Sequence, residues 1–426
     1  MERYVKVRIT MESSNTKRIL QDIMDSESNF EMVNKFLLNA DYLDDYKIIT
    51  ISDKKNVLPE YFGYKKIDEK SGAGIYSIFL ENDLHFIDKK VLSDYKTCNK
   101  ATFKIDYTVS FDTQAVSYFD NMLKGKAIPE TFRTALDFII KQNLNIDVIP
   151  YIVENSSKLG NHSIREAMFD TLRSCQILRS LDKEYYVKYG KIRSVFAESE
   201  NQRELDELID VCEKFHLMYQ TSGFDRFEYP FILLIVMTEI YLNSNKSSEK
   251  KTEDFLHYCH HLFHNLPLRI AHIANLFFSK QNNSIFFKKI QKGKDKTALL
   301  SELENMAWDL HHISGMEDIF PFYDNDSEKF VAKMILTFDR GLIELIETKP
   351  TLALAYSLKR SENFPIYAYT EEDDFLSKCT SSYLNSEAAK ERAAKMLEQE
   401  LDLKVILDKT KDLFLKGELL SVGSFL

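Results

Sequence analysis

The chain has 426 residues, 44% of them hydrophobic, so it is long enough to bury a large core and to form two or three domains. Its 12 glycines and 8 prolines are few, which predicts a helix-rich globular protein with few long loops. The formal net charge of −10 argues against a general nucleic-acid coat, although 56 Lys and Arg residues leave room for a local basic groove.

Cysteine usage and the apolar segments predict a cytoplasmic protein without a membrane partner. The five cysteines are scattered and form no CxxC pair, as is usual in a reducing compartment. The first ten residues, MERYVKVRIT, lack the apolar stretch of a signal peptide. The longest apolar run, residues 229–242, contains Glu239 and is too short for a bilayer, so it predicts a buried helix.

Residues 1–95 are expected to form a small α+β accessory unit. Segments 4–11, 47–52 and 74–80 have the pattern of strands, and segments 17–24 and 30–40 have helical spacing. No residue set in this unit has the spacing of a catalytic or metal-binding motif. We therefore expect it to serve recognition rather than chemistry.

Residues 96–160 are predicted to form the first part of an α/β core. Segment 103–111 alternates apolar and polar residues like a strand, and segment 113–123 has helical spacing. Asp112 lies between the two, where an Asp is also a common helix N-cap, so a capping role alone stays open. A second helix, after Pro150, is expected to carry Glu154.

Residues 161–298 are predicted to form a large, almost wholly helical insertion. Four of its histidines are spaced to share one helix face, namely His257, His260, His261 and His264. Zinc sites use pairs at such offsets, but no HExxH motif and no companion Cys pair accompany them. We expect a solvated or phosphate-facing face there.

Residues 299–426 are predicted to complete the core and to add C-terminal helices. Segment 299–320 is an amphipathic helix with Asp309 at the edge of its apolar stripe. Trp308 points almost opposite the stripe, so it needs a second packing partner or lies exposed. His312 is expected to face elsewhere and to form no catalytic pair with Asp309.

A short apolar run at residues 334–336 predicts a strand that is buried on both faces. Asp339 follows it, and residues 342–347 begin a new helix after a turn at Arg340 and Gly341. Taken alone, Asp339 is an ordinary turn residue. A carboxylate at the carboxyl end of a buried strand, however, stands where open α/β sheets bind ligands.

Four acidic residues thus follow one another in a specific structural order: Asp112, Glu154, Asp309 and Asp339. This order resembles the PIN-like (PilT N-terminus) nuclease superfamily, in which four such residues meet at the carboxyl edge of a parallel sheet. Segment 110–119 (SFDTQAVSYF) resembles the first motif of the family, and segments 307–310 (AWDL) and 334–342 (MILTFDRGL) resemble the third and fourth. The resemblance implies an α/β fold, a three-layer α/β/α core around a central parallel sheet.

The resemblance also implies that these four acidic residues are the catalytic residues and the metal ligands. Clustered carboxylates repel one another, and a hard divalent cation with oxygen ligands relieves the repulsion, so Mg²⁺ or Mn²⁺ is the expected cofactor. The metal would orient a water for in-line attack on a phosphodiester. The expected activity is that of an endoribonuclease acting on RNA, with DNA as the alternative substrate. Asp112, Asp309 and Asp339 should then converge in one coordination shell.

Two alternatives stay open. Glu239, in the segment LIVMTEIYL, is a rival of Glu154 for the second acidic position. A helical interaction or scaffold protein with acidic strand ends is the alternative to an enzyme, since none of the motifs GxGxxG, GxxxxGK[ST] and GxSxG occurs. The helical insertion also offers surface for a homo-oligomer.

Overall fold

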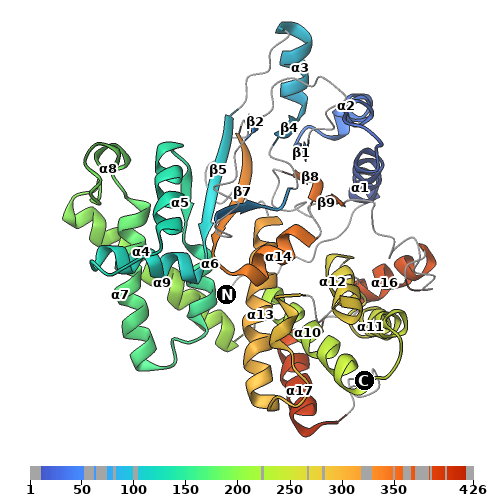
Figure 1. Cartoon of the computed structure of the whole chain (residues 1–426). Helices are drawn as coiled ribbons and strands as arrows, with labels where there is room; N and C mark the ends of the chain where they lie inside the picture. The colour runs from blue at the N-terminus through green and yellow to red at the C-terminus, as the bar shows by residue number, and fades with distance from the viewer. Residues whose placement is uncertain are drawn as a thin grey trace.

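The computed structural model describes residues 11–51, 62–63, 74–79, 83–98, 104–221, 225–265, 268–280, 284–317, 329–348, 351–357, 366–369, 383, 386–398 and 401–418. These residues form a mixed α/β protein with two sheets and many helices (Figure 1). Most of the strand expected at 4–11 lies outside the described residues, as does the end of the helix expected at 299–320.

Two sheets of different type organise the fold. Sheet A is antiparallel and has the strand order β2 (Phe62–Gly63), β4 (Asp83–Ile87), β1 (Tyr46–Ile51), β8 (Thr351–Ser357) and β9 (Ile366–Tyr369). Sheet B has the order β3 (Gly74–Ser77), β7 (Lys329–Thr337), β5 (Lys104–Phe111) and β6 (Asn145–Asp147). In sheet B, β5 runs parallel to both β6 and β7, whereas β3 is antiparallel to β7.

The helices fall into three groups along the chain. The first comprises α1 (Met11–Met24), α2 (Asn29–Leu38), the short η1 (Ala40–Tyr42) and α3 (Lys89–Cys98). The second comprises α4 (Thr113–Leu123), α5 (Glu130–Lys141), α6 (Ile149–Ser156), α7 (His162–Arg179), α8 (Lys183–Tyr189) and α9 (Glu198–Thr221). The third comprises α10 (Asp225–Asn243), α11 (Ser248–Leu262), α12 (Leu268–Lys280), η4 (Phe287–Lys289), α13 (Lys296–Glu317), α14 (Arg340–Thr348), α16 (Ser386–Glu398) and α17 (Leu403–Lys416).

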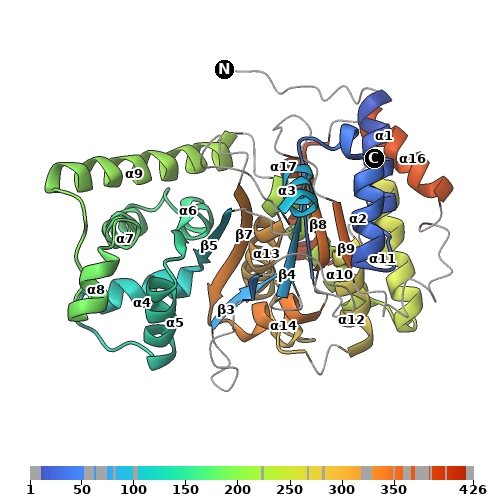
Figure 2. The same cartoon turned by 90° about the horizontal axis from the view of Figure 1, so that it is seen from above.

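The sheets and helices are stacked as layers that share three hydrophobic cores. Seen from above, α4 to α9 flank sheet B on one side, and α1 and α2 lie beyond sheet A on the other (Figure 2). On β7, Met334 and Leu336 enter the core under α4 to α9, whereas Ile335 enters the core shared with sheet A. The predicted strand at 334–336 is therefore confirmed, and it is buried on both faces.

Both sheets draw strands from distant parts of the chain. The strands β1, β2 and β4 of the predicted accessory unit form sheet A together with β8 and β9, and β3 of the same unit pairs with β7. A few short strands cannot bury an apolar face alone, which explains why they are shared. The central sheet is consequently mixed, because β3 adds an antiparallel strand at its edge.

Trp308 has the second packing partner that its position on α13 requires. It is buried and stacks on Phe227 of α10, with ring centroids 4.2 Å apart. Helix α13 is therefore packed against other elements on more than its apolar stripe.

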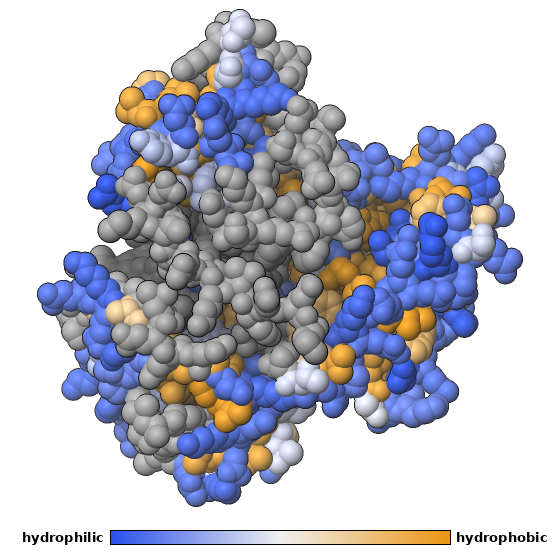
Figure 3. All heavy atoms as spheres, turned by 180° about the vertical axis from the view of Figure 1, so that it is seen from behind, coloured by the Kyte–Doolittle hydropathy of each residue, from blue (hydrophilic) through white to orange (hydrophobic). Residues whose placement is uncertain are grey.

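Seen from behind, the described surface is largely hydrophilic, with apolar side chains in separate patches (Figure 3). In the part of the chain that is described, no helix is both long and apolar enough to cross a bilayer.

A buried ion pair ties sheet A to α3. The Lys47 ammonium lies 2.7 Å from Asp88 Oδ2 and 4.0 Å from the centre of the Phe330 ring. Asp88 also accepts a hydrogen bond from the backbone N–H of Val91. The lysine is 1% exposed, so Asp88 is the counter-ion that compensates its loss of hydration.

We expect Asp88→Asn to lower the free energy of unfolding by about 3 kcal/mol, because it leaves the Lys47 charge buried without its counter-ion. Urea unfolding followed by circular dichroism measures the change. The matched control is Asp44→Asn, which removes the Asp44–Lys89 pair at the surface, where both side chains are about half exposed. The control should unfold like the unchanged protein, and an equally small effect of Asp88→Asn would contradict the prediction.

Candidate active site

Asp112 lies at the carboxyl end of β5 and begins α4. Its Oδ1 accepts a hydrogen bond from the backbone N–H of Ala115 at 2.6 Å, so it is an N-cap. The β5–β7 register, which sets Phe111 opposite Leu336, brings Asp112 beside Thr337. Asp112 is therefore both the N-cap of α4 and the residue at the end of β5, and it is 5% exposed.

Asp339 lies just beyond the carboxyl end of β7 and begins α14. Its Oδ1 accepts hydrogen bonds from the backbone N–H groups of Gly341, at 2.6 Å, and Leu342, at 3.3 Å. The turn expected at Arg340 and Gly341 is the first turn of α14. A Cβ at position 341 would lie 3.0 Å from this Oδ1 and 3.3 Å from Phe286 Cα, so a larger residue there would displace these neighbours by a few tenths of an ångström. The capping bonds engage Oδ1, while Oδ2 lies 3.8 Å from Lys289 Nζ.

These two aspartates flank the point where the strand order of sheet B reverses direction. From β5 the chain crosses to β6 on one side, and it later returns to β7 on the other side of β5. In open α/β sheets, the crevice at the carboxyl ends of the strands on either side of such a switch point is the usual ligand site. Asp112 and Asp339 both stand at that edge.

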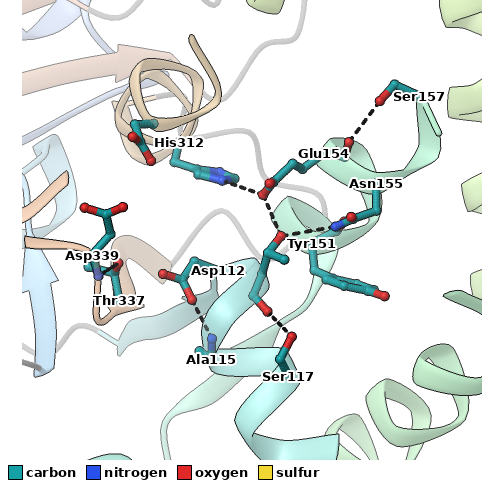
Figure 4. A network of polar contacts seen from close by, with 12 residues as sticks. Asp112, Ala115, Ser117, Tyr151, Glu154, Asn155, Ser157, His312, Thr337 and Asp339 are labelled. Atoms are coloured by element: carbon teal, nitrogen blue, oxygen red, sulfur yellow. Dashed lines mark hydrogen bonds and ion pairs between the residues drawn. The ribbon is translucent and has the colours of Figure 1, made fainter. Parts of the chain in front are cut away.

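Two helices bring the other predicted residues to the same edge. Asp309 extends from α13, with its Oδ2 3.9 Å from the same Lys289 Nζ that faces Asp339. Glu154 extends from α6, and its Oε2 accepts a hydrogen bond from Thr113 Oγ1 at 2.5 Å and lies 3.3 Å from His312 Nε2. Figure 4 shows Asp112, Asp339, Glu154 and His312 around one space.

Burial raises the pKa of two of these carboxyl groups. The pKa of Asp309 rises to about 8, because the group is buried and because the Asp339 carboxylate repels its charge, while Lys289 offsets this only in part. The pKa of Asp112 rises to about 6, chiefly through burial, against hydrogen bonds from Thr337 and from the backbone of Ala115. Both shifts arise chiefly from burial, which disfavours the charged carboxylate.

Glu154 and His312 form a buried pair that keeps its charges. Burial alone would raise the pKa of Glu154, but the contact with His312 outweighs it, and the pKa lies below its ordinary value. Burial would likewise lower the pKa of His312, yet Glu154, Asp309 and Asp112 raise it. The Nδ1 atom of His312 is buried and has no hydrogen-bond partner among the described residues.

The four predicted residues therefore share one edge of sheet B, but they do not form a closed coordination shell. Within the described ranges, no three His, Cys, Asp or Glu residues are grouped so as to hold one metal ion. Lys289 lies between Asp309 and Asp339, and His312 contacts Glu154. The donors fit a hard divalent cation in kind, since they are carboxylate oxygens from side chains that are buried or partly buried, and Lys289 stands where such an ion would bind.

Three participating side chains were not predicted from the sequence. His312 was expected to face elsewhere, but it lies one helical turn from Asp309 and contacts Glu154; the i,i+3 spacing was a signal that could have found it. Thr113 directly follows Asp112 and could have been included with it. Lys289 lies in η4 and carries no sequence signal for this role.

Glu239, the rival of Glu154, lies elsewhere. It belongs to α10, lines a separate cavity and contacts Asn243. The expected solvated histidine face is wrong for His260 and His264, which are both buried. The His260 ring packs against Tyr383, and its Nε2 lies 3.4 Å from a Glu391 oxygen of α16, because that helix covers this face of α11.

No protein-family model matches the chain, and no curated protein and no solved structure shows significant similarity to it. A function for the chain is therefore inferred from the geometry and the chemistry of the site.

We expect Asp309 to contribute a fall in the stability of the protein as the pH rises from about 4 to about 8. The unfolded state ionises this carboxyl group near pH 4, whereas the folded state keeps the proton up to about pH 8. Within that window the contribution is about 1.4 kcal/mol per pH unit.

Asp309→Asn should flatten this part of the profile and raise the Tm above that of the unchanged protein at pH 9. Thermal unfolding at a series of pH values measures both effects. The control, Asp402→Asn, alters an exposed N-cap of α17 and should leave the slope unchanged. A slope that persists in Asp309→Asn would show that other groups cause it.

Proposed function

We propose that the protein is a metal-dependent nuclease that hydrolyses phosphodiester bonds, with RNA as its substrate. The observation that carries the proposal is the meeting of Asp112 and Asp339 at the switch point of sheet B, beside the buried Asp309. Carboxylates in such a place repel one another, and a hard divalent cation relieves the repulsion while it binds an anionic substrate.

We further propose that β6, β5 and β7, with α4, α6 and α13, form a PIN-like core. The order of the acidic residues along the chain and the parallel pairing of β5 with both of its neighbours support this. Helices α7 to α12 would then be the insertion at 161–298, and β3 would be an addition to the edge of the core. An accessory unit at 1–95 and self-association through the insertion belong to the same proposal.

Of the four predicted ligands, we propose that Asp112, Asp309 and Asp339 hold Mg²⁺ or Mn²⁺. A bound divalent cation supplies an activated water and neutralises charge on the phosphodiester. Glu154 has its Oε2 engaged by Thr113 and His312, so its role in this arrangement is to hold the charged imidazole beside the aspartates. Lys289 must leave the space between Asp309 and Asp339, and its ammonium is then free to contact a phosphate.

Cleavage of single-stranded RNA in the presence of Mn²⁺ tests the proposal. We expect Asp112→Asn and Asp339→Asn each to lower the rate by about 100-fold or more, since each removes a charged ligand at the reacting centre. Asn is itself a good N-cap, so both variants should keep α4 and α14. Asp402→Asn is the matched control, because it makes the same change at an N-cap outside the site.

Each outcome of the cleavage assay has one meaning. Equal activity in Asp339→Asn would show that a contaminant cleaves the RNA. If the unchanged protein cleaves neither RNA nor DNA with Mg²⁺ or Mn²⁺, the nuclease proposal fails and a helical interaction or scaffold protein is the remaining interpretation. Cleavage of DNA but not RNA would support metal-dependent phosphodiester hydrolysis and overturn RNA as the substrate.

Metal binding has a readout that is independent of cleavage. At pH 8 we expect Mn²⁺ to raise the Tm of the unchanged protein, since a ligand at 100 times its Kd stabilises the fold by about 2.7 kcal/mol. The double variant Asp309→Asn/Asp339→Asn should show no such rise. Lys289→Met should need less Mn²⁺ for half of the effect, because it removes the competing charge 3.8 and 3.9 Å from the two aspartates. An equal rise in the double variant would place the metal elsewhere.

A further inference from the structure

A cavity of about 600 Å³ lies between α10, α11 and the turn that joins them. This volume falls in the range of pockets that hold small molecules. Val236, Ile240 and Tyr258 supply apolar and aromatic walls, and Glu239 and Asn243 supply polar groups. None of the acidic residues at the edge of sheet B lines the cavity, so it is a separate feature of the molecule.

Glu239 is the unusual member of this lining. Its side chain is buried, with the residue 3% exposed, and its Oε1 accepts a hydrogen bond from Asn243 Nδ2. Its Oε2 has no hydrogen-bond partner among the described residues. A buried carboxylate oxygen without a donor destabilises a fold by about 1–3 kcal/mol or more, so a donor is expected to meet it.

The two lysines near the cavity do not supply that donor, and His257, which also lines it, has its Nδ1 2.8 Å from the Tyr383 hydroxyl. Lys246 lies at the rim, but its ammonium is 2.9 and 2.7 Å from the two carboxylate oxygens of Asp254. Lys296 affects Glu239 only through space, and its ammonium donates to the backbone carbonyl of Phe414 at 2.6 Å. With Lys246 and Asp254 balancing each other, Glu239 is the acidic group of the lining without a paired cation. Burial raises its pKa above the ordinary value, and a bound cation would favour its ionised form.

We propose that this cavity binds a small organic cation whose ammonium or amidinium N–H group donates to the Glu239 carboxylate. The apolar or aromatic body of the ligand would pack on Val236, Ile240 and Tyr258. A charge-assisted hydrogen bond in a buried place is stronger than a neutral one, which gives the site its preference for a cation. The proposal does not depend on nuclease activity.

Calorimetric titration of the full chain with benzamidinium tests the proposal. We expect it to bind at least 10-fold more tightly than benzyl alcohol, which has the same aromatic body without the charged donors. We expect Glu239→Gln to weaken benzamidinium by 10-fold or more, because the change removes the charge and keeps the size of the side chain. Glu253→Gln, which makes the same change at an exposed position of α11 outside the lining, should change the affinity by less than about 3-fold, as is usual for an exposed charge.

The comparison of the two probes on the unchanged chain decides the matter even if a variant folds poorly. Equal affinity for benzamidinium and benzyl alcohol would show a merely apolar cavity and overturn the proposal. Absence of benzamidinium binding, or equal binding in a folded Glu239→Gln, would overturn it as well. The Tm of Glu239→Gln should equal or exceed that of the unchanged protein, because a buried charge is lost while the contact with Asn243 is kept.

Discussion

The parallel pairing of β5 with β7 is the constraint on which the rest of the structure depends. Eight residue pairs, from Lys104 and Lys329 to Phe111 and Leu336, align two segments that are far apart in the sequence. This register sets Asp112 beside Thr337 and brings α14 to the edge where α4 begins. A shift by one residue would turn every side chain of the strand to the opposite face, so both cores that β7 serves hold the alignment fixed.

The same pairing creates an electrostatic problem that the protein resolves with two cations. Asp309 and Asp339 face a single lysine from another segment, and Glu154 faces a buried histidine. Removing His312 would leave the Glu154 carboxylate without its counter-ion where both side chains are largely shielded from water, whereas Lys289 and Asp339 are partly exposed. The site is thus held together by charges that a substrate or an ion is able to replace, whereas the cores on either side are apolar and fixed.

The parts of this arrangement that depend on local sequence patterns could be predicted from the sequence. Alternation over the strand before Asp112, the apolar run before Asp339 and the helical spacing around Asp309 each predict an element and the place of its acidic residue. The pairing of β1 with β8 and the arrival of Lys289 were not predictable, because they depend on contacts between distant segments. The packing of α16 over His260 was not predictable for the same reason. His312 is different, since its spacing from Asp309 was a local signal that pointed to one helix face.

The stacking of Trp308 on Phe227 makes the molecule its own spectroscopic reporter. The chain has one tryptophan, so its entire indole emission comes from the helical turn that carries Asp309 and His312. The indole also packs edge-on against His311, and Phe227 belongs to α10, the helix that carries Glu239 at its other end. Trp308 lies where α13 meets α10. A change of charge or packing around Asp309 and His312 should therefore alter the tryptophan fluorescence of the unlabelled protein.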